Sequence, residues 1–255
     1  MSPFHRSLRA AAAAALAAAP LAGSAAVAAP LAQAPMHHAS TGTPFFISHG
    51  GPAHTTTTST NWSGYAATGS KFSSVTTTFT QPAVDCSKGD GYSSFWVGLD
   101  GYNSNTVEQT GTEADCSGGA ASYSAWYEMY PKFPVTYSNT VRPGDSITES
   151  VSFGGSSSFT LTLSDSTQGW SRTVTKKLTN AKRSSAEVIA EAPYSGGVLP
   201  LADFGKVSFS GSTVNGSTLS NFNPVGIDMV SSSGTPEATV SSLSGGSFSI
   251  TWNSL

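Results

Sequence analysis

Beyond about residue 61, hydrophobic and polar residues alternate along most of the chain. Short runs rich in Val, Thr, Ser and aromatic residues are separated by Gly, Ser, Asn and Pro, and no apolar stripe of helical period follows the N-terminus. A period of two is typical of β-strands, because successive side chains point to opposite faces of a sheet. The pattern predicts strands near 72–81, 92–100, 105–115, 122–131, 145–154, 157–166, 170–178, 185–193, 204–212, 226–232 and 245–255. We therefore expect an all-β fold, an antiparallel two-sheet β-sandwich.

The N-terminus has a different pattern. Arg6 and Arg9 precede the apolar run Ala10–Ala19, and small residues follow up to Ala28. This arrangement predicts a secretory signal peptide, whereas a membrane anchor would need about 20 apolar residues. The next stretch is rich in Pro, Gly and Thr and is typical of a linker or pro-segment. We expect a signal peptide at 1–28, a pro-segment at 29–58 and one folded domain at 59–255, and hence a secreted protein.

Charge limits the possible partners of the domain. All fifteen acidic residues but only ten of the twelve Lys and Arg lie beyond residue 61, which leaves a net charge of −5 there. Nothing is basic enough to predict nucleic-acid binding. No later run is apolar enough to predict a membrane span.

The chain has two cysteines, Cys86 and Cys116. In an exported protein an even pair usually forms a disulfide, and we expect one here. The alternative is a reactive thiol, which would need a histidine partner.

Histidine is absent from the predicted domain. A Ser-His-Asp or Cys-His site is therefore excluded inside it, and a zinc site of the usual ligand types is not expected. We expect no metal and no cofactor. The five histidines are His5, His37, His38, His49 and His54.

Acids and amides alternate with aromatic residues on one face of four predicted strands. The residues that share a face are Val107, Gln109, Gly111 and Glu113; Trp126, Glu128 and Tyr130; Glu187, Ile189 and Glu191; and Trp96, Gly98 and Asp100. Each strand alone is explained by a solvent-facing side. Four together favour a polar cleft lined by aromatic side chains. A carboxylate there can act as a general base, and an amide NH2 can donate to a developing oxyanion.

At these residues the sequence resembles the glutamic peptidase family, the eqolisins, which has fungal and bacterial members; we expect a member of the bacterial type. The resemblance runs from Asn61 to the C-terminus. Five blocks carry it: FWVGLDG (95–101), EQTGTE (108–113), YSAWYEMYP (123–131), AEVIAE (186–191) and LADFGKVSF (201–209). It implies a sandwich of jelly-roll or concanavalin-like type, with the active-site cleft on the concave face of one sheet.

The resemblance also implies the site. The family's catalytic glutamine matches Gln109 and its catalytic glutamate matches Glu187. The expected supporting or substrate-binding residues are Trp62, Trp96, Asp100, Glu113, Trp126 and Glu128. The family often has Asp at position 113, Trp at 129 and an aromatic residue at 188, where this chain has Glu113, Met129 and Val188. These departures bear on substrate preference and pH optimum.

The expected function is that of a monomeric, secreted acid endopeptidase that hydrolyses polypeptides by a Glu/Gln pair acting directly on water. Two alternatives remain at this stage. One is a glycoside hydrolase that uses Glu187 and Glu128 as its two carboxylates. The other is a carbohydrate-binding module, which would explain the aromatic residues but not the five blocks.

Overall fold

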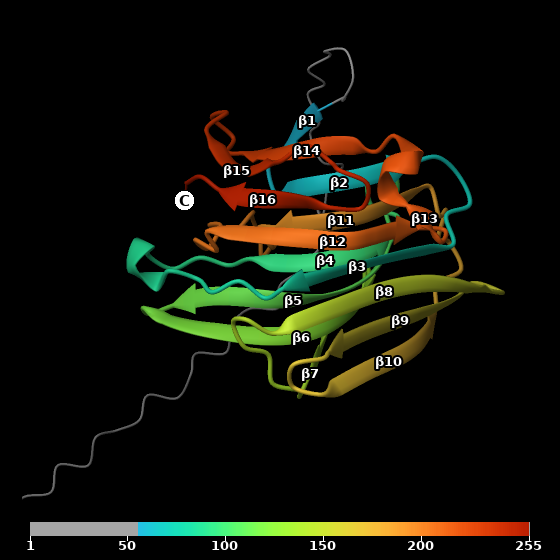
Figure 1. Ribbon diagram of the computed structural model, residues 1–255, viewed down its shortest axis with the longest axis horizontal. Coiled ribbons are helices and arrows are strands. Elements are labelled where there is room, and N and C mark those ends of the chain that lie inside the picture. Colours follow the sequence, from blue (N-terminus) through green and yellow to red (C-terminus); the bar gives the residue numbers. More distant parts are fainter. Residues whose placement is uncertain (1–55, 255) are drawn as a thin grey trace, which may run out of the picture. The chain divides into compact units, whose positions relative to one another are not determined.

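The structure is a computed structural model that describes residues 56–254. These residues form an almost entirely β-structure (Figure 1). Within this range the helices are two short 3-10 turns, η1 (Cys86–Lys88) and η2 (Leu219–Phe222). No helix in the described range is long and apolar enough to cross a membrane. The expected signal peptide and nearly all of the expected pro-segment lie outside the described residues.

The strands follow one another in a continuous hydrogen-bonded order from β10 to β7. That order is β10 (Trp170–Lys177), β9 (Ser158–Asp165), β8 (Ser146–Gly155), β3 (Ser74–Thr80), β12 (Lys206–Val214), β16 (Phe248–Trp252), β15 (Pro236–Val240), β14 (Val225–Val230), β2 (Trp62–Thr68), β11 (Ser185–Glu191), β4 (Ser94–Leu99), β5 (Val107–Ser117), β6 (Ala120–Tyr130) and β7 (Val135–Tyr137). Two strands lie beside this path: β1 (Thr56–Ser59) pairs in parallel with β14, and β13 (Ser217–Thr218) pairs with β12.

The sheet folds back on itself to make two layers. Strands β3, β8 and β9 pack across the interior against β4 and β5, and Figure 1 shows β12, β3 and β8 lying over β11, β4 and β5. The all-β antiparallel sandwich expected from the sequence is confirmed. The two layers are parts of one continuous sheet, so the sandwich is joined by hydrogen bonds through β16, β15 and β14.

The main core fills the space between the layers. Strands β8 and β9 bury every second residue, for example Ile147, Val151, Leu161 and Leu163. The alternate positions on β9 and β10 carry Ser and Thr pairs. This alternation is the physical reason that the sequence pattern identified these strands.

A second apolar cluster lies on the other face of the β2–β11–β4–β5–β6 layer. It consists of Trp62, Ala66, Trp96, Val107, Trp126, Ile189 and Ile227. These five strands are buried on both faces over much of their length, and β2, β4 and β11 are buried almost throughout. Strand β2 was not predicted as a separate strand, because a strand covered on both sides shows little alternation. Strands β1, β7, β13 and β15 were also not predicted, and each has five residues or fewer.

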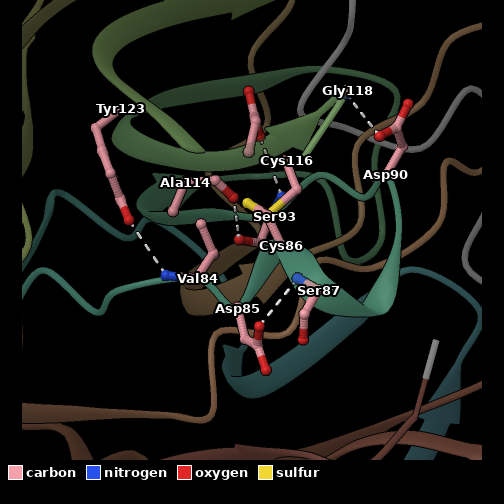
Figure 2. The surroundings of a disulfide bond; sticks show 11 residues. Val84, Asp85, Cys86, Ser87, Asp90, Ser93, Ala114, Cys116, Gly118 and Tyr123 are labelled. Carbon is pink, nitrogen blue, oxygen red and sulfur yellow. Dashed lines mark hydrogen bonds between the residues drawn. A yellow bond between two sulfur atoms is a disulfide. The ribbon is translucent and has the colours of Figure 1, made fainter. Parts of the chain in front are cut away.

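A disulfide joins Cys86 of η1 to Cys116 near the end of β5, as the sequence predicted. Figure 2 shows its surroundings. The backbone N–H of Val84 donates to the Tyr123 hydroxyl at 3.2 Å, and the N–H of Gly118 donates to Asp90 at 2.8 Å. These contacts attach the loop before β4 to the β5–β6 hairpin. The disulfide thus fixes one end of the two strands that carry Gln109 and Glu128.

Candidate active site

Four neighbouring strands bring the predicted catalytic residues into one row across the sheet. Glu187 of β11 pairs with Gly98 of β4, Gly98 pairs with Gln109 of β5, and Gln109 pairs with Glu128 of β6. Paired residues point to the same face, so Glu187, Gln109 and Glu128 lie on one side of the layer. Two strand spacings separate the backbones of Glu187 and Gln109, about 10 Å. Both side chains are long enough to meet above the glycine between them.

Gly98 leaves no room for a side chain at that position. A Cβ atom there would lie 2.9 Å from Cζ3 of Trp96, 3.1 Å from Cγ1 of Val107 and 3.3 Å from Cβ of Gln109. The glycine therefore lets the indole of Trp96 approach the strand beside the two catalytic candidates. The sequence pattern placed Trp96 and Gly98 on one face, and the structure adds the close contact between them.

Gln109 is held by Glu128. Its side-chain Nε2 donates a hydrogen bond of 2.9 Å to Oε2 of Glu128, and both residues are fully buried. Oε1 of Gln109 has no hydrogen-bond partner among residues 56–254. An amide NH2 has two donors, so Gln109 keeps one N–H and one carbonyl oxygen for other groups.

Glu187 is fully buried, and neither carboxyl oxygen has a hydrogen-bond partner of normal geometry in the described part of the chain. Burial raises the pKa of Glu187 well above its usual range, and the negative charge of Asp100 raises it further. The Ser185 hydroxyl and the Tyr102 backbone lie close enough to oppose this shift. A buried carboxyl without partners is costly for stability, which is typical of a group retained for chemistry.

The next row on the same face lies two residues along each strand. It contains two tryptophans together with an isoleucine and a glycine: Ile189, Trp96, Gly111 and Trp126. A Cβ on Gly111 would lie 2.6 Å from Cβ of Trp96 and 2.9 Å from Cζ2 of Trp126, so this glycine lets the two indoles close in from both sides. Trp62 packs edge-on against Trp96, with ring centroids 5.0 Å apart.

Glu191 of β11 belongs to the same site, although the sequence did not single it out as a site residue. Its Oε2 accepts a hydrogen bond of 2.7 Å from Nε1 of Trp96, and its Oε1 accepts one of 3.2 Å from Nδ2 of Asn61. Burial and the charge of Glu128 raise the pKa of Glu191 well above its usual range. The alternation in the sequence does place Glu191 on the same face as Glu187. No sequence pattern indicates that Trp96 and Asn61 are its hydrogen-bond partners.

Asp100 supports the site by holding a loop. Its carboxylate accepts hydrogen bonds from the backbone N–H groups of Lys182, Arg183 and Ser184, at 2.7 to 2.8 Å, and one of 3.0 Å from the Ser184 hydroxyl. This loop leads directly into the strand of Glu187. The structure thus places Asp100 at the base of β11.

The remaining acids divide between the two faces. Glu113 lies on the face of Gln109, and its Oε2 accepts from the Ser124 hydroxyl at 2.8 Å. Glu108 is the neighbour of Gln109 on β5 and so points to the opposite face, and burial raises its pKa to about 9. Glu149 of β8 is fully buried between the layers, where burial raises its pKa well above the usual range and the nearby Val97 backbone of β4 opposes the shift.

No group of three or more His, Cys, Asp or Glu side chains within residues 56–254 has an arrangement that would hold a metal ion. The row instead combines a buried carboxyl, an oriented amide and aromatic walls. A carboxyl and an amide of this kind can bind a water molecule and a carbonyl group together.

The chain is similar to known proteins over most of the described residues. Residues 60–252 match the model of a family described as the Peptidase A4 family. The chain is 32% identical over 221 residues to aspergillopepsin-2 of Aspergillus niger, covering 76% of this chain and 78% of that protein. It is 34% identical over 142 residues to scytalidopepsin B of Scytalidium lignicola, covering 53% and 52%.

Solved structures show the same fold. A crystal structure of scytalido-glutamic peptidase with a transition-state analogue inhibitor matches with a TM-score of 0.68 and 26% identity, covering 76% of this chain and 98% of that one. The crystal structure of aspergilloglutamic peptidase from Aspergillus niger matches with a TM-score of 0.54 and 31% identity, covering 64% and 99%.

Proposed function

Because this chain belongs to the Peptidase A4 family and is a glutamic endopeptidase, we propose that Glu187 and Gln109 form its catalytic pair. The observation that carries the proposal is their position in one row of the sheet with only Gly98 between them. Each also has buried polar atoms without a partner among the described residues. Because these atoms are unpaired within the described residues, a water molecule and a peptide carbonyl group that enter this buried row would find hydrogen-bonding groups there.

In the first step, ionised Glu187 takes a proton from the water while the water oxygen bonds to the carbonyl carbon. The electrons of the C=O double bond move to the carbonyl oxygen. The second N–H of Gln109 donates to this oxyanion, and its Oε1 accepts a hydrogen bond from the water. Glu128 fixes the amide in this orientation through the bond to Nε2.

In the second step, protonated Glu187 donates its proton to the nitrogen of the scissile amide. The C–N bond breaks, the electrons of the oxyanion restore the C=O bond, and an amine and a carboxylic acid are released. Glu187 is then ready for another water. No covalent intermediate with the protein and no metal is needed.

Burial affects the working pH. The first step needs ionised Glu187, so activity rises with pH towards the pKa of this group. An exposed Glu would be ionised above about pH 4.3. Because burial raises the pKa of Glu187, we propose an acid endopeptidase whose activity begins at a higher pH than it would with an exposed Glu as the base.

The other predicted site residues have supporting roles in this proposal. Trp62, Trp96 and Trp126 form the buried apolar cluster beside the row, and we propose that a polypeptide binds next to them. Glu128 orients Gln109, and Asp100 holds the loop before Glu187. Glu113 extends the polar face towards the end of β5.

We also propose that the protein is exported, with a signal peptide at 1–28, a pro-segment at 29–58 and the peptidase domain at 59–255. The Cys86–Cys116 disulfide supports this, because disulfides persist in oxidising compartments. Strand β1 spans the proposed boundary between pro-segment and domain, since it covers Thr56–Ser59.

The glycosidase alternative is disfavoured by the family and by the row itself. Glu187 and Glu128 are three strand spacings apart, about 14 Å between backbones, with Gln109 between them. A glycosidase would have no use for the bond between Gln109 and Glu128.

The test measures hydrolysis of an unfolded protein substrate by Glu187→Gln and Gln109→Ala across acidic pH. Both variants should lose activity by at least about 100-fold with a normal circular dichroism spectrum. Glu149→Gln is the matched control, since Glu149 is equally buried but belongs to β8 and does not lie in the catalytic row. Two results would contradict the proposal: either site variant cleaves the substrate at the wild-type rate, or the wild-type enzyme loses its activity when a chelator is added.

A further inference from the structure

A chain of buried hydrogen bonds connects the first strand of the domain to the catalytic row. The Ser59 hydroxyl donates to Oδ1 of Asn61 at 3.2 Å, and Nδ2 of Asn61 donates to Glu191. The other oxygen of Glu191 accepts from the Trp96 indole at 2.7 Å. All four side chains are at most 2% exposed.

Trp96 carries this connection to the reacting residues. Its Nε1 is fixed by Glu191, whereas its Cζ3 lies against Gly98, the residue that separates Glu187 from Gln109. A rotation of the indole about its own bonds would move the edge that touches Gly98. The position of that edge is therefore set by a hydrogen bond at the opposite end of the ring.

Strand β1 holds the other end of the chain. It pairs in parallel with β14 from Thr56 to Ser59. The Ser59 hydroxyl also accepts from the backbone N–H groups of Asn61 and Trp62, at 3.3 and 3.1 Å. Through these bonds the segment before β2 is locked where Asn61 can reach Glu191.

We propose that Asn61 and Glu191 are positioning residues for peptide hydrolysis, that β1 keeps them in place, and that maturation of the enzyme occurs upstream of Thr56. The processing point would then lie before the 58/59 boundary drawn from the sequence pattern, because that boundary falls within β1. The proposal rests on the function proposed above. A chain cut between Ser59 and Asn61 would keep its core and the bond from Trp96 to Glu191, but it would lose the β1 segment and the Ser59 bonds that position Asn61. The exact point of processing would therefore set the activity of the product.

The chemistry of Glu191 fits a positioning role better than a packing role. A buried carboxyl costs stability unless its oxygens are hydrogen-bonded, and an apolar side chain of equal size would be cheaper. The two oxygens of the carboxyl group accept one bond each, from the indole N–H and from the Asn61 amide. The pair of acceptors fixes direction, which apolar packing does not.

The first experiment measures kcat and KM of Asn61→Ala, Glu191→Gln and the double variant in the full chain. Glu191→Gln keeps one acceptor and loses the other. We expect kcat to fall about 10- to 100-fold and KM to change less than about 3-fold, because a small displacement at the reacting groups acts mainly on the chemical step. The double variant should be no slower than the slower single variant, since both break one chain.

Matched controls separate positioning from stability. Glu149→Gln changes an equally buried acid of β8, and Asn215→Ala removes a side chain that likewise holds a backbone turn, at Ser73 and Ser74. Both should keep wild-type kcat. Ser59→Ala is a milder probe if Asn61→Ala does not fold, and it should lower kcat at least about 3-fold.

The second experiment is N-terminal sequencing of the mature enzyme, which should begin at or before Thr56. A fully active mature enzyme that begins at Asn61 or later would overturn the proposal, and so would wild-type kcat in Asn61→Ala and Glu191→Gln. If those two are normal while Glu187→Gln and Gln109→Ala are inactive, the positioning proposal fails alone. If Glu187→Gln is active, the catalytic assignment itself fails.

Discussion

Gln109 and Glu128 are paired residues of neighbouring strands, and the amide of one donates to the carboxyl of the other at 2.9 Å. This bond uses one N–H of Gln109 and leaves its Oε1 and its second N–H for other groups. Glu128 thereby determines which way the amide faces. The orientation of the proposed oxyanion donor thus depends on a residue that need not react.

Removing this acceptor should therefore slow hydrolysis while the fold is retained. We expect Glu128→Ala to lower kcat about 10- to 100-fold, because Gln109 can then rotate away from the reacting position. Glu128→Gln keeps one acceptor oxygen and should recover part of the loss. Steady-state kinetics on one peptide substrate should give the highest kcat for the wild type, a lower one for Glu128→Gln and the lowest for Glu128→Ala. Equal kcat values for Glu128→Ala and the wild type would contradict this prediction.

A side chain at position 98 should disturb both stability and activity. Gly98→Ala brings a Cβ to 2.9 Å from Trp96, so the indole or the strand must shift. The expected loss of stability is about 1 to 3 kcal/mol, with lower kcat. Gly154→Ala is the control, since its Cβ would meet only a backbone oxygen at 3.9 Å. Urea unfolding and kinetics of both variants measure the difference.

The acid side of the pH profile should respond to Asp100. The negative charge of Asp100 raises the pKa of Glu187, so Asp100→Asn should lower that pKa and let the base ionise at lower pH. We therefore expect the rising limb of kcat/KM against pH to move to lower pH. The loop at 182–184 loses part of its anchor, so the profile is measured at a temperature where circular dichroism shows the variant folded. A limb that moves to higher pH would count against this electrostatic role.

Stability should decrease as the pH rises. Burial raises the pKa of Glu108, Glu149, Glu187 and Glu191, so the folded state holds protons that the unfolded chain releases above about pH 4.5. Below that pH the four groups are protonated in both states, so the folded state has its full stability. This stability is lost as the pH rises through the pKa values of the folded state, about 9 for Glu108. Urea midpoints should fall steadily between pH 4.5 and 8.

Glu149→Gln isolates one of these groups. This substitution removes one titrating site that lies on β8 and faces the opposite side of β4 from the catalytic row, so unfolding should release up to one proton fewer across the same range. The slope of unfolding free energy against pH should become shallower by that amount. An unchanged slope would show that Glu149 does not contribute.

The disulfide should matter for stability rather than for catalysis. Cys86 and Cys116 are 30 residues apart, and opening a loop of this length costs about 3 to 4 kcal/mol on the chain-entropy estimate. Cys116 lies seven residues from Gln109 along β5, about 23 Å. The double Ala variant should unfold at lower urea concentration but keep its kcat at low temperature, as kinetics well below the transition would show.

The sequence allowed the faces of the strands to be predicted but not their neighbours. Alternation placed Gln109 and Glu187 each on a face shared with aromatic or acidic residues. It could not show that Gly98 lies between them, because strand order depends on pairing between distant segments. The catalytic assignment came from the resemblance of whole blocks, and the row supplies a geometric reason for it.

The bond between Asn61 and Glu191 could not be predicted for a similar reason. The two residues are 130 positions apart in sequence and meet because β2 and β11 are antiparallel neighbours. Nor did the pattern identify Asp100 as a loop anchor, since its bonds are to backbone N–H groups that any sequence provides. Contacts of this kind become visible only in three dimensions.

The two ends of the strand order have a consequence for self-association. Strands β7 and β10 lie together at one side of the sandwich, where Val135 of β7 and Lys176 and Lys177 of β10 line one pocket. Unpaired edge strands invite addition of another chain, which leads to fibres. Arg172, Lys176 and Lys177 place three basic side chains along β10. In acid, when carboxylates lose their charge, these cations remain, so edge-to-edge contact between two molecules is repelled under the very conditions in which we propose that the enzyme works.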